Sequence, residues 1–306
     1  MKKPELLAPS GNVKTLKAAV EAGADAVYLG AGKFSARAFA GNFDGSELSY
    51  AIEYAANADV KVYLAVNTLM TDRELKDALT IVGEAYHAGA AAFIVQDLGL
   101  AAEIKKQYPD AILHASTQMT AQTLKDVNLL GSLGFKRVVM ARELSRDEIR
   151  NIAANTSVEL EIFVHGALCS SYSGQCLMSS FIGGRSANRG KCAQPCRLPY
   201  KSGKKSGVLL SLKDLCLIDY IDEMADMGVA SLKIEGRMKG EDYVRAVVGA
   251  YRAVLDGKNL TEKQKAKMLG VFDRGGYTDG YYTGNRAGMY MENLKNPYGK
   301  GRKRAD

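Results

Sequence analysis

The chain has 306 residues, of which 47% are hydrophobic and 25% are charged, a composition typical of water-soluble globular proteins. Its formal net charge of +7 and pI near 9.0 favour an acidic or polyanionic partner. No apolar run reaches transmembrane length and no apolar leader precedes the first expected strand, so we expect a cytoplasmic protein without a membrane partner.

Short apolar runs bounded by turn signals alternate with helix-length amphipathic stretches along the chain. This alternation indicates βα units and a parallel sheet. The expected strands are 5–8, 26–30, 60–66, 92–95, 111–114, 137–140, 158–164 and 229–234. Eight such units predict a TIM-type (β/α)8 barrel, and an open doubly wound sheet is the alternative that periodicity leaves open.

The residues left over from a barrel of usual size lie mostly between the seventh strand and its helix, which we expect to start near Asp214. The predicted organisation is a barrel over 1–257, an insertion over 167–213 and a C-terminal extension with a basic tail over 258–306. An apolar run at 208–212 is a possible ninth strand, which we assign to the insertion. The loop at 31–45 is also long, and such loops are often functional.

Barrel enzymes build their active sites at the carboxyl ends of the strands. The candidates for substrate binding at these ends are Arg37, Asn67, Arg142, Lys233 and Arg237, and the candidates for proton transfer and catalysis are His114, His165 and Glu235. Arginine and lysine suit a carboxylate or phosphate ligand. The alternative is a salt-bridge network in which these cations pair with Glu143 and Glu235.

Four of the five cysteines, Cys169, Cys176, Cys192 and Cys196, lie within 28 residues of the expected insertion. Cytosolic thiols stay reduced, so this clustering indicates a metal centre. Only the spacing between Cys192 and Cys196 resembles a zinc knuckle, and the longer spacings suit an iron-sulfur cluster. Spacing alone leaves three possibilities open, namely an iron-sulfur cluster, zinc and unliganded thiols. Cys216 is expected as a core residue at the start of the next helix, and it would replace any of the four that is not a ligand.

Several blocks around and beyond the cysteines are distinctive. They read EIFVHGALC at 161–169, SGQCLMS at 173–179, ELLAPSG at 5–11, KIEGRMK at 233–239 and FDRGGYT at 272–278. Together and in this order, the blocks resemble peptidase family U32, the collagenase-like proteins. The family name implies proteolysis, yet the chain has no His-Glu-x-x-His helix and no cue for an activated serine.

Other members of that family imply different chemistry, namely oxygen-independent hydroxylation of tRNA wobble uridine, of a ribosomal RNA cytidine or of a ubiquinone precursor. In them a 4Fe-4S cluster is held by cysteines of this region, and prephenate is associated with the RNA enzymes as the hydroxyl source. By this resemblance Cys169, Cys176, Cys192 and Cys196 are the cluster ligands here, with the fourth position open between Cys196 and Cys216. Because prephenate is a dicarboxylate, it would give the cations at the strand ends a reason to converge.

We therefore predict an oxygen-independent tRNA hydroxylase that forms 5-hydroxyuridine at the wobble position, with prephenate as donor. The alternatives are a collagenase-like peptidase, with Cys169 near His165 as nucleophile and base, and a non-catalytic RNA-binding or assembly subunit. Relative to the longer uridine hydroxylases the chain lacks an extra C-terminal domain, so a longer paralogue is an expected partner. The basic segment at 298–304 could bind phosphates or serve as a solubilising end.

Overall fold

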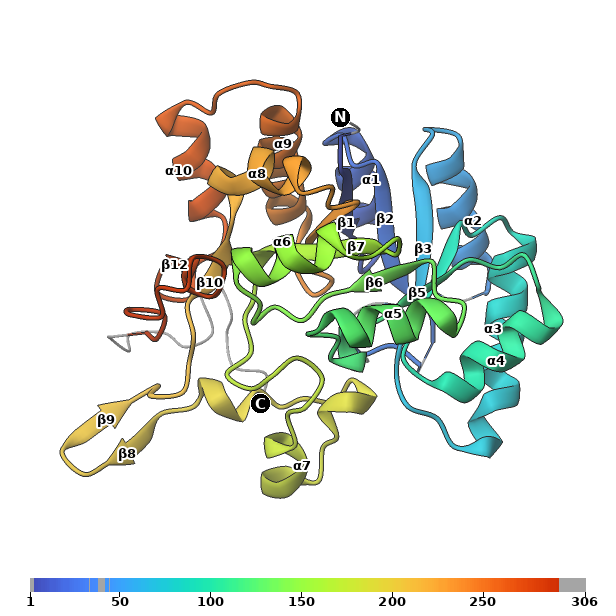
Figure 1. Cartoon of the computed structure of the whole chain (residues 1–306), viewed down its shortest axis with the longest axis horizontal. Coiled ribbons are helices and arrows are strands. Elements are labelled where there is room, and N and C mark those ends of the chain that lie inside the picture. Colours follow the sequence, from blue (N-terminus) through green and yellow to red (C-terminus); the bar gives the residue numbers. More distant parts are fainter. Residues whose placement is uncertain (1–2, 33, 38–41, 44, 292–306) are drawn as a thin grey trace.

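The computed structural model describes residues 3–32, 34–37, 42–43 and 45–291. Eight parallel strands form a closed barrel with helices around it, as predicted (Figure 1). The barrel strands are β1 (Glu5–Pro9), β2 (Ala26–Gly30), β3 (Lys61–Val66), β4 (Ala92–Val95), β5 (Leu113–Ala115), β6 (Arg137–Val139), β7 (Glu159–Gly166) and β11 (Ser231–Ile234). Closure is made by β11, which pairs in parallel with both β1 and β7. The doubly wound alternative is therefore wrong.

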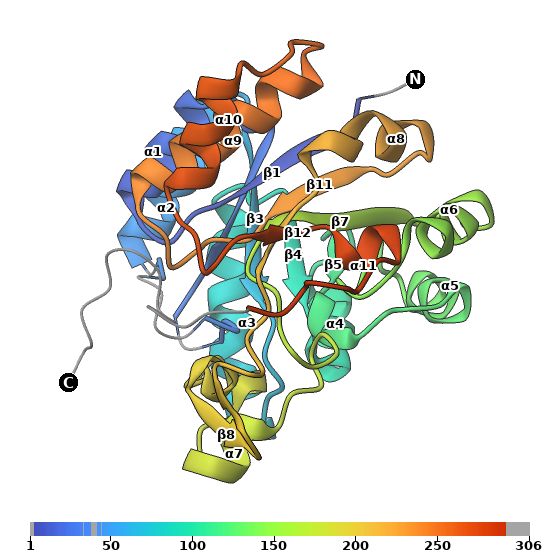
Figure 2. The ribbon, with the colours of Figure 1, turned by 90° about the vertical axis from the view of Figure 1, so that its left-hand side faces the viewer.

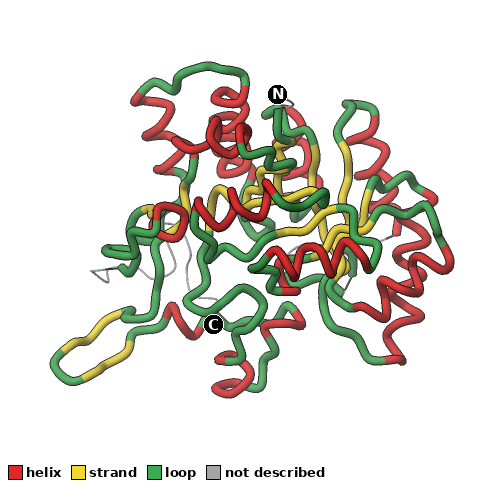
Figure 3. Tube along the Cα trace, viewed as in Figure 1, coloured by secondary structure: helices red, strands yellow, loops and turns green. Residues whose placement is uncertain are grey.

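The outer layer consists of helices that follow the barrel strands along the chain. They are α1 (Val13–Glu21), α2 (Gly45–Ala56), α3 (Asp72–His87), α4 (Leu98–Gln107), α5 (Leu124–Ser132), α6 (Arg146–Ala154), α8 (Ile221–Asp226) and α9 (Glu241–Leu255). Figure 3 shows these helices around the strands. The main hydrophobic core lies between this layer and the strands, whose residues are almost all buried. No helix among the described residues is both long and apolar enough to cross a membrane.

Helix starts follow local sequence signals. Asn12, Thr71, Thr123 and Ser145 each form a capping box with the residue three positions later. Each box satisfies backbone N–H groups that the first helical turn leaves without partners. These caps direct the chain from the strand ends into the helices, and so they fix the loops at the carboxyl end of the barrel.

The segment at 167–213 follows β7 and folds into short pieces beyond the carboxyl end of the barrel. Its elements are α7 (Met178–Gly183), the 3-10 turns η2 (Ala187–Arg189) and η3 (Pro195–Arg197), and a hairpin of β8 (Tyr200–Ser202) and β9 (Lys205–Gly207). The run at 208–212 is not a strand. Only Leu212 forms an isolated bridge, with Tyr290, so the barrel count of eight is confirmed.

One predicted helix start is wrong. The helix predicted to start near Asp214 is instead a strand, β10 (Asp214–Cys216), and α8 begins only at Ile221. β7 extends beyond the barrel to Gly166 and offers an edge with which β10 pairs in antiparallel orientation. Cys216 is accordingly a strand residue opposite His165 and not a helix residue.

The predicted C-terminal extension is described as far as Met291. Its elements are α10 (Glu262–Gly270), β12 (Tyr277–Thr278) and α11 (Gly280–Thr283). α10 packs on α9, and β12 pairs with β10, so this part of the extension lies against the barrel. The basic segment at 298–304 lies outside the described residues.

Candidate functional site

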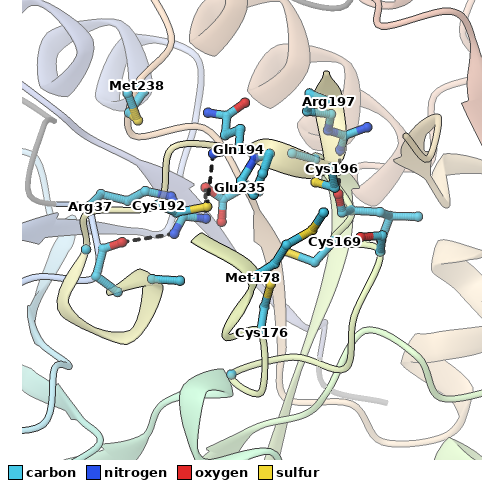
Figure 4. Close-up of a pocket in the computed structure, with 18 of the residues that line it drawn as sticks. Arg37, Cys169, Cys176, Met178, Cys192, Gln194, Cys196, Arg197, Glu235 and Met238 are labelled. Carbon is cyan, nitrogen blue, oxygen red and sulfur yellow. Dashed lines mark hydrogen bonds and ion pairs between the residues drawn. The ribbon is translucent and has the colours of Figure 1, made fainter. Parts of the chain in front are cut away.

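All four clustered cysteines line one cavity of about 360 Å³ beyond the carboxyl end of the barrel. Figure 4 shows their side chains around this space, with Arg37 and Glu235 beside them. Met178, Arg197 and Arg274 also line the cavity. The loop after β2, the insertion and the segment after β11 therefore contribute to a single site.

Close backbone packing holds the first part of the insertion in place. Gly166 has φ of +105°, and a Cβ there would lie 2.7 Å from the carbonyl oxygen of Glu235. Gly174 has φ of +79°, and a Cβ there would lie 2.5 Å from the carbonyl oxygen of Gln118. Only glycine adopts such φ values readily while leaving room for a neighbouring backbone. These two glycines explain how Cys169 and Cys176 are brought against the barrel.

Arg197 joins the two ends of the insertion. Its buried guanidinium donates to the carbonyl oxygen of Leu168 and the hydroxyl of Ser211, both at 2.5 Å, and to the carbonyl oxygen of Leu212. Burial lowers its pKa, and the nearby charge of Arg274 lowers it further. Because Arg197 follows Cys196 directly, this clamp also fixes the last of the clustered cysteines.

The four thiols are donors that fit an iron-sulfur cluster, and thiolates also bind zinc. Within the described part of the chain, no three cysteine, histidine or acidic side chains lie close enough together to hold one metal ion. A tetrahedral zinc ion needs its ligands around one point, whereas an iron-sulfur cluster takes thiolates at its separate irons, around a volume. The Gln194 backbone N–H also donates to Cys192 Sγ at 3.3 Å. Such donors are typical around ligating sulfur.

The thiols of Cys192 and Cys196 are held in their protonated form near neutral pH. Burial raises the pKa of Cys192 and of Cys196, and the neighbouring cysteines add to the rise. Metal binding by these residues would therefore release protons.

A second, smaller cavity of about 70 Å³ adjoins the first at the mouth of the barrel. Arg37, Cys169 and Glu235 line both. Four cations, Arg37, Arg142, Lys233 and Arg237, line the smaller cavity against a single carboxylate, Glu235. The mouth of the barrel thus has a surplus of positive charge.

Glu235 is held by two of these cations. Arg37 Nη2 lies 3.2 Å from its Oε1, and Arg142 Nη2 lies 3.0 Å from its Oε2. Burial disfavours the charged carboxylate, but Arg37, Arg142, Arg237 and Lys233 outweigh that effect and lower the pKa of Glu235 to about 2. Glu235 is therefore a weak proton acceptor at neutral pH, and its structural role is to hold Arg37 and Arg142.

The other two cations, Lys233 and Arg237, are each held by a different neighbour. Lys233 Nζ lies 2.7 Å from Glu161 Oε1 inside the barrel and 4.4 Å from the centre of the Tyr28 ring. Arg237 donates to the hydroxyl of Ser35. Burial lowers the pKa of Lys233, and it lowers that of Arg237 to about 10. Arg237 therefore remains charged at neutral pH, and no carboxylate among the described residues is bonded to it.

All five predicted substrate-binding residues line the smaller cavity. Both ends of the Asn67 side-chain amide are hydrogen-bonded. Its oxygen accepts from the Ala36 N–H and its nitrogen donates to Ser116 Oγ, both at 3.0 Å. It therefore positions the loop that carries Arg37. Their role in binding a substrate stays a prediction.

Neither predicted catalytic histidine is among the residues that line these two cavities. His114 lies inside the barrel, with its ring 4.8 Å from that of Tyr63, and burial lowers its pKa well below the ordinary value. His165 packs against Tyr243 and Tyr251 of α9, and burial lowers its pKa to about 3. Cys169 and His165 therefore do not share a cavity, as a thiol nucleophile and its base would need to. The catalytic roles of both histidines and of Glu235 stay predictions.

Sequence reasoning missed several residues of the site. Tyr28 and Phe163 form the aromatic walls, and the Arg142 guanidinium carbon lies 3.7 Å from the centre of the Phe163 ring. Strict alternation along β2 and β7 would have indicated that both face the barrel interior. Arg197 carried no such signal, because a buried arginine within a loop has no periodic pattern.

The sequence profile described as Peptidase family U32 matches residues 11–292. The chain belongs to this family. It is 40% identical over 271 residues to the tRNA hydroxylation protein P1 of Bacillus subtilis, covering 83% of this chain and 64% of that protein. It is also 40% identical over 259 residues to the 23S rRNA 5-hydroxycytidine C2501 synthase of Escherichia coli, covering 82% of this chain and 39% of that protein. The chain thus spans less than two thirds of either U32 relative.

A solved structure described as a U32 peptidase has the same fold. It matches with a TM-score of 0.52 at 14% identity, over 77% of this chain and 94% of the other. This similarity extends the barrel assignment to the U32 family and carries no information on activity.

Proposed function

We propose that this U32 protein is an oxygen-independent RNA hydroxylase that forms 5-hydroxyuridine at the wobble position of tRNA. The observation that carries the proposal is the cavity of about 360 Å³, in which four cysteine thiols meet the arginines and Glu235 of the barrel mouth. The names of the two RNA-modifying relatives supply the substrate class. We place the protein in the cytoplasm, where tRNA is found.

The proposed cofactor is a 4Fe-4S cluster held by Cys169, Cys176, Cys192 and Cys196. Bound there, it would supply Lewis-acidic iron and a one-electron redox centre next to the barrel mouth. The Gln194 N–H, which donates to Cys192 Sγ, would stabilise the thiolate form of that ligand. Cys169 lines both cavities, which links the proposed cofactor site to the substrate site.

The proposed hydroxyl donor is prephenate. Its two carboxylates match the positive surplus that Arg142, Lys233, Arg237 and Arg37 create against Glu235. The pairing of Arg37 and Arg142 with Glu235 holds both guanidinium groups in place before a ligand arrives, so less freedom is lost on binding. Replacement of a C–H by a C–OH oxidises the uracil base, so the donor must be reduced by the same two electrons as it gives up its oxygen.

A longer paralogue is the proposed protein partner, and it would add further RNA contacts. The peptidase alternative gains no support from the geometry, because neither cavity is lined by a histidine. The other alternative, a non-catalytic RNA-binding or assembly subunit, would retain affinity for tRNA but show no turnover without its paralogue.

The proposal is tested by mass spectrometry of nucleosides from tRNA of a strain that lacks this chain. We expect 5-hydroxyuridine derivatives to disappear, once any paralogue is also removed, and to return with the wild-type chain. Cys176→Ser should not restore them, whereas Cys216→Ser, which changes a cysteine outside the cavity, should. Unchanged hydroxyuridine in the double deletion would overturn the proposal. Peptide hydrolysis that survives metal removal but not Cys169→Ser would support the peptidase alternative instead.

A further inference from the structure

The positive charge of the protein is concentrated in the insertion. Residues 167–213 contain eight lysine and arginine residues and no aspartate or glutamate, so they carry +8, while the whole chain carries only +7. The rest of the chain is therefore nearly neutral. So one-sided a charge favours a polyanionic partner over a positively charged one.

The same insertion exposes large apolar side chains. Phe181 in α7 is 85% exposed, and Tyr172, Leu177 and Ile182 are each more than half exposed. A phenylalanine exposed to this extent gains little from folding, and clustered exposed apolar groups mark interaction sites. Since α7 packs against η3, which contains Cys196, these side chains lie near the edge of the cysteine-lined cavity.

The lysines lie on an element that projects from the body. The hairpin of β8 and β9 extends outward beyond the carboxyl end of the barrel, at the same end as α7, and Figures 1 and 2 show this from two sides. Lys201, Lys204 and Lys205 on this hairpin are exposed. Among the described strands these two pair with each other and with no barrel strand, so the hairpin adds little to the barrel.

We propose that the insertion is a docking surface for single-stranded RNA, with the hairpin lysines on phosphates and Phe181 stacked on a base. Proteins that bind single strands combine a positively charged track with aromatic faces for bases, and both are present here. An anionic membrane is a weaker match, because α7 has only six residues and interfacial helices are longer. This inference rests on the proposed function, which requires an unpaired base to reach the cavity.

The charge component is tested by fluorescence anisotropy of the full chain with a labelled RNA stem-loop that contains uridines in its loop. Replacement of Lys201, Lys204 and Lys205 by glutamine should weaken binding at least tenfold. The slope of log affinity against log salt should fall by about two, since each phosphate contact on a single strand contributes roughly 0.7.

The matched control replaces Lys258, Lys263 and Lys267 by glutamine. These lysines are exposed and lie on or next to α10, at the opposite end of the molecule (Figure 2). The control removes the same charge and should change affinity less than about twofold. Equal effects of the two triple variants would overturn the proposal, because they would show only a response to net charge.

The stacking component is tested at Phe181 with the same RNA. Phe181→Leu and Phe181→Ala should each weaken binding at least fivefold, as expected from about 1–3 kcal/mol per stacked base, whereas Phe181→Trp should retain it. Equal binding by the leucine and tryptophan variants would show an apolar contact without stacking and would contradict the assignment.

Two further outcomes separate this inference from the proposed function. RNA binding that depends on Phe181 and the hairpin, in a protein whose loss leaves hydroxyuridine unchanged, would support the docking surface while the proposed function failed. Hydroxyuridine formation by a chain without any measurable affinity for RNA would support the proposed function and overturn the docking surface. Lysine-dependent binding to phosphatidylglycerol vesicles or to an acidic protein, with none to RNA, would also overturn the inference.

Discussion

Arg142 and Glu235 form a nearly buried ion pair at the mouth of the barrel, with Arg142 Nη2 3.0 Å from Glu235 Oε2. The same carboxylate binds Arg37 through its other oxygen. One negative charge therefore serves two guanidinium groups, and any ligand that carries carboxylates enters a site where the arginines are already oriented.

Removal of the Glu235 charge is expected to destabilise the fold. In Glu235→Gln both arginines lose their anionic partner in a buried place, which costs about 3 kcal/mol of unfolding free energy. Urea unfolding measures the loss. Glu21→Gln is the control, because its pair with Arg245 is about half exposed and should contribute less than about 1 kcal/mol. Equal losses would show that the pairs at the barrel mouth are no stronger than surface pairs.

The stabilisation by Glu235 should also depend on pH. Its pKa of about 2 in the folded protein lies below the ordinary value of 4.5, so the unfolded carboxyl takes up a proton first as the pH falls. The stabilisation is therefore present above about pH 4.5 and is lost progressively toward pH 2. Unfolding curves of the wild type and Glu235→Gln should differ by a constant amount above that range and converge below it. A gap that is undiminished at about pH 2 would contradict the assigned cause.

Much of the fold follows from local pattern. The eight barrel strands are apolar runs bounded by turns, and the rule that sites form at strand ends brings Arg142, Lys233 and Arg237 to one cavity. The strand at Asp214–Cys216 was not predictable, because it exists only through its pairing with the extended edge of β7. Three residues without strong periodicity give no sign of such a long-range partner.

The orientation of the His165 side chain could not be predicted from the sequence either. Alternation along β7 from Glu161 and Phe163 predicts that His165 also faces the barrel interior. The register shifts at this point, with Lys233 opposite Phe163 but Ile234 opposite His165, so one residue of β7 is extra. Such a bulge re-aims the side chains that follow, and His165 packs against α9. A bulge depends on the partner strand, so alternation within β7 alone could not reveal it.

The buried His165 is expected to make the free energy of unfolding fall as the pH drops into the mildly acidic range. Burial, together with the charge of Lys239, lowers its pKa to about 3, so the unfolded state gains a proton below about pH 6.5 that the folded state does not bind. Stability should then fall as the pH drops, by at most about 1.4 kcal/mol per pH unit from this group. His165→Phe should have a shallower decline between about pH 6.5 and 4 in urea unfolding. An identical slope would mean that His165 binds a proton in the folded protein.

Arg197 is expected to control the integrity of the insertion. Arg197→Met would leave the carbonyl groups of Leu168 and Leu212 without their donor, at a cost of about 1–3 kcal/mol each if they stay buried. Limited proteolysis should then cleave residues 167–213 faster while the barrel persists. Lys191→Met, which changes an exposed cation in the same segment, should leave the cleavage rate unchanged. Equal rates for both variants would show that Arg197 is not the clamp.

The fourth ligand of the proposed cluster is either Cys196 or Cys216, which the sequence alone does not distinguish. Cys196 lines the cavity with Cys169, Cys176 and Cys192, whereas Cys216 does not; it packs against the core with its Sγ 4.0 Å from Tyr251 Oη. A ligand must reach the shared space, so Cys196→Ser should lose most of its iron and acid-labile sulfide after anaerobic purification, and Cys216→Ser should keep both. Circular dichroism of the two variants would show whether both are folded. Loss of iron from Cys216→Ser alone would assign the ligand to β10, and stoichiometric zinc in the wild type would remove the cluster from the proposal.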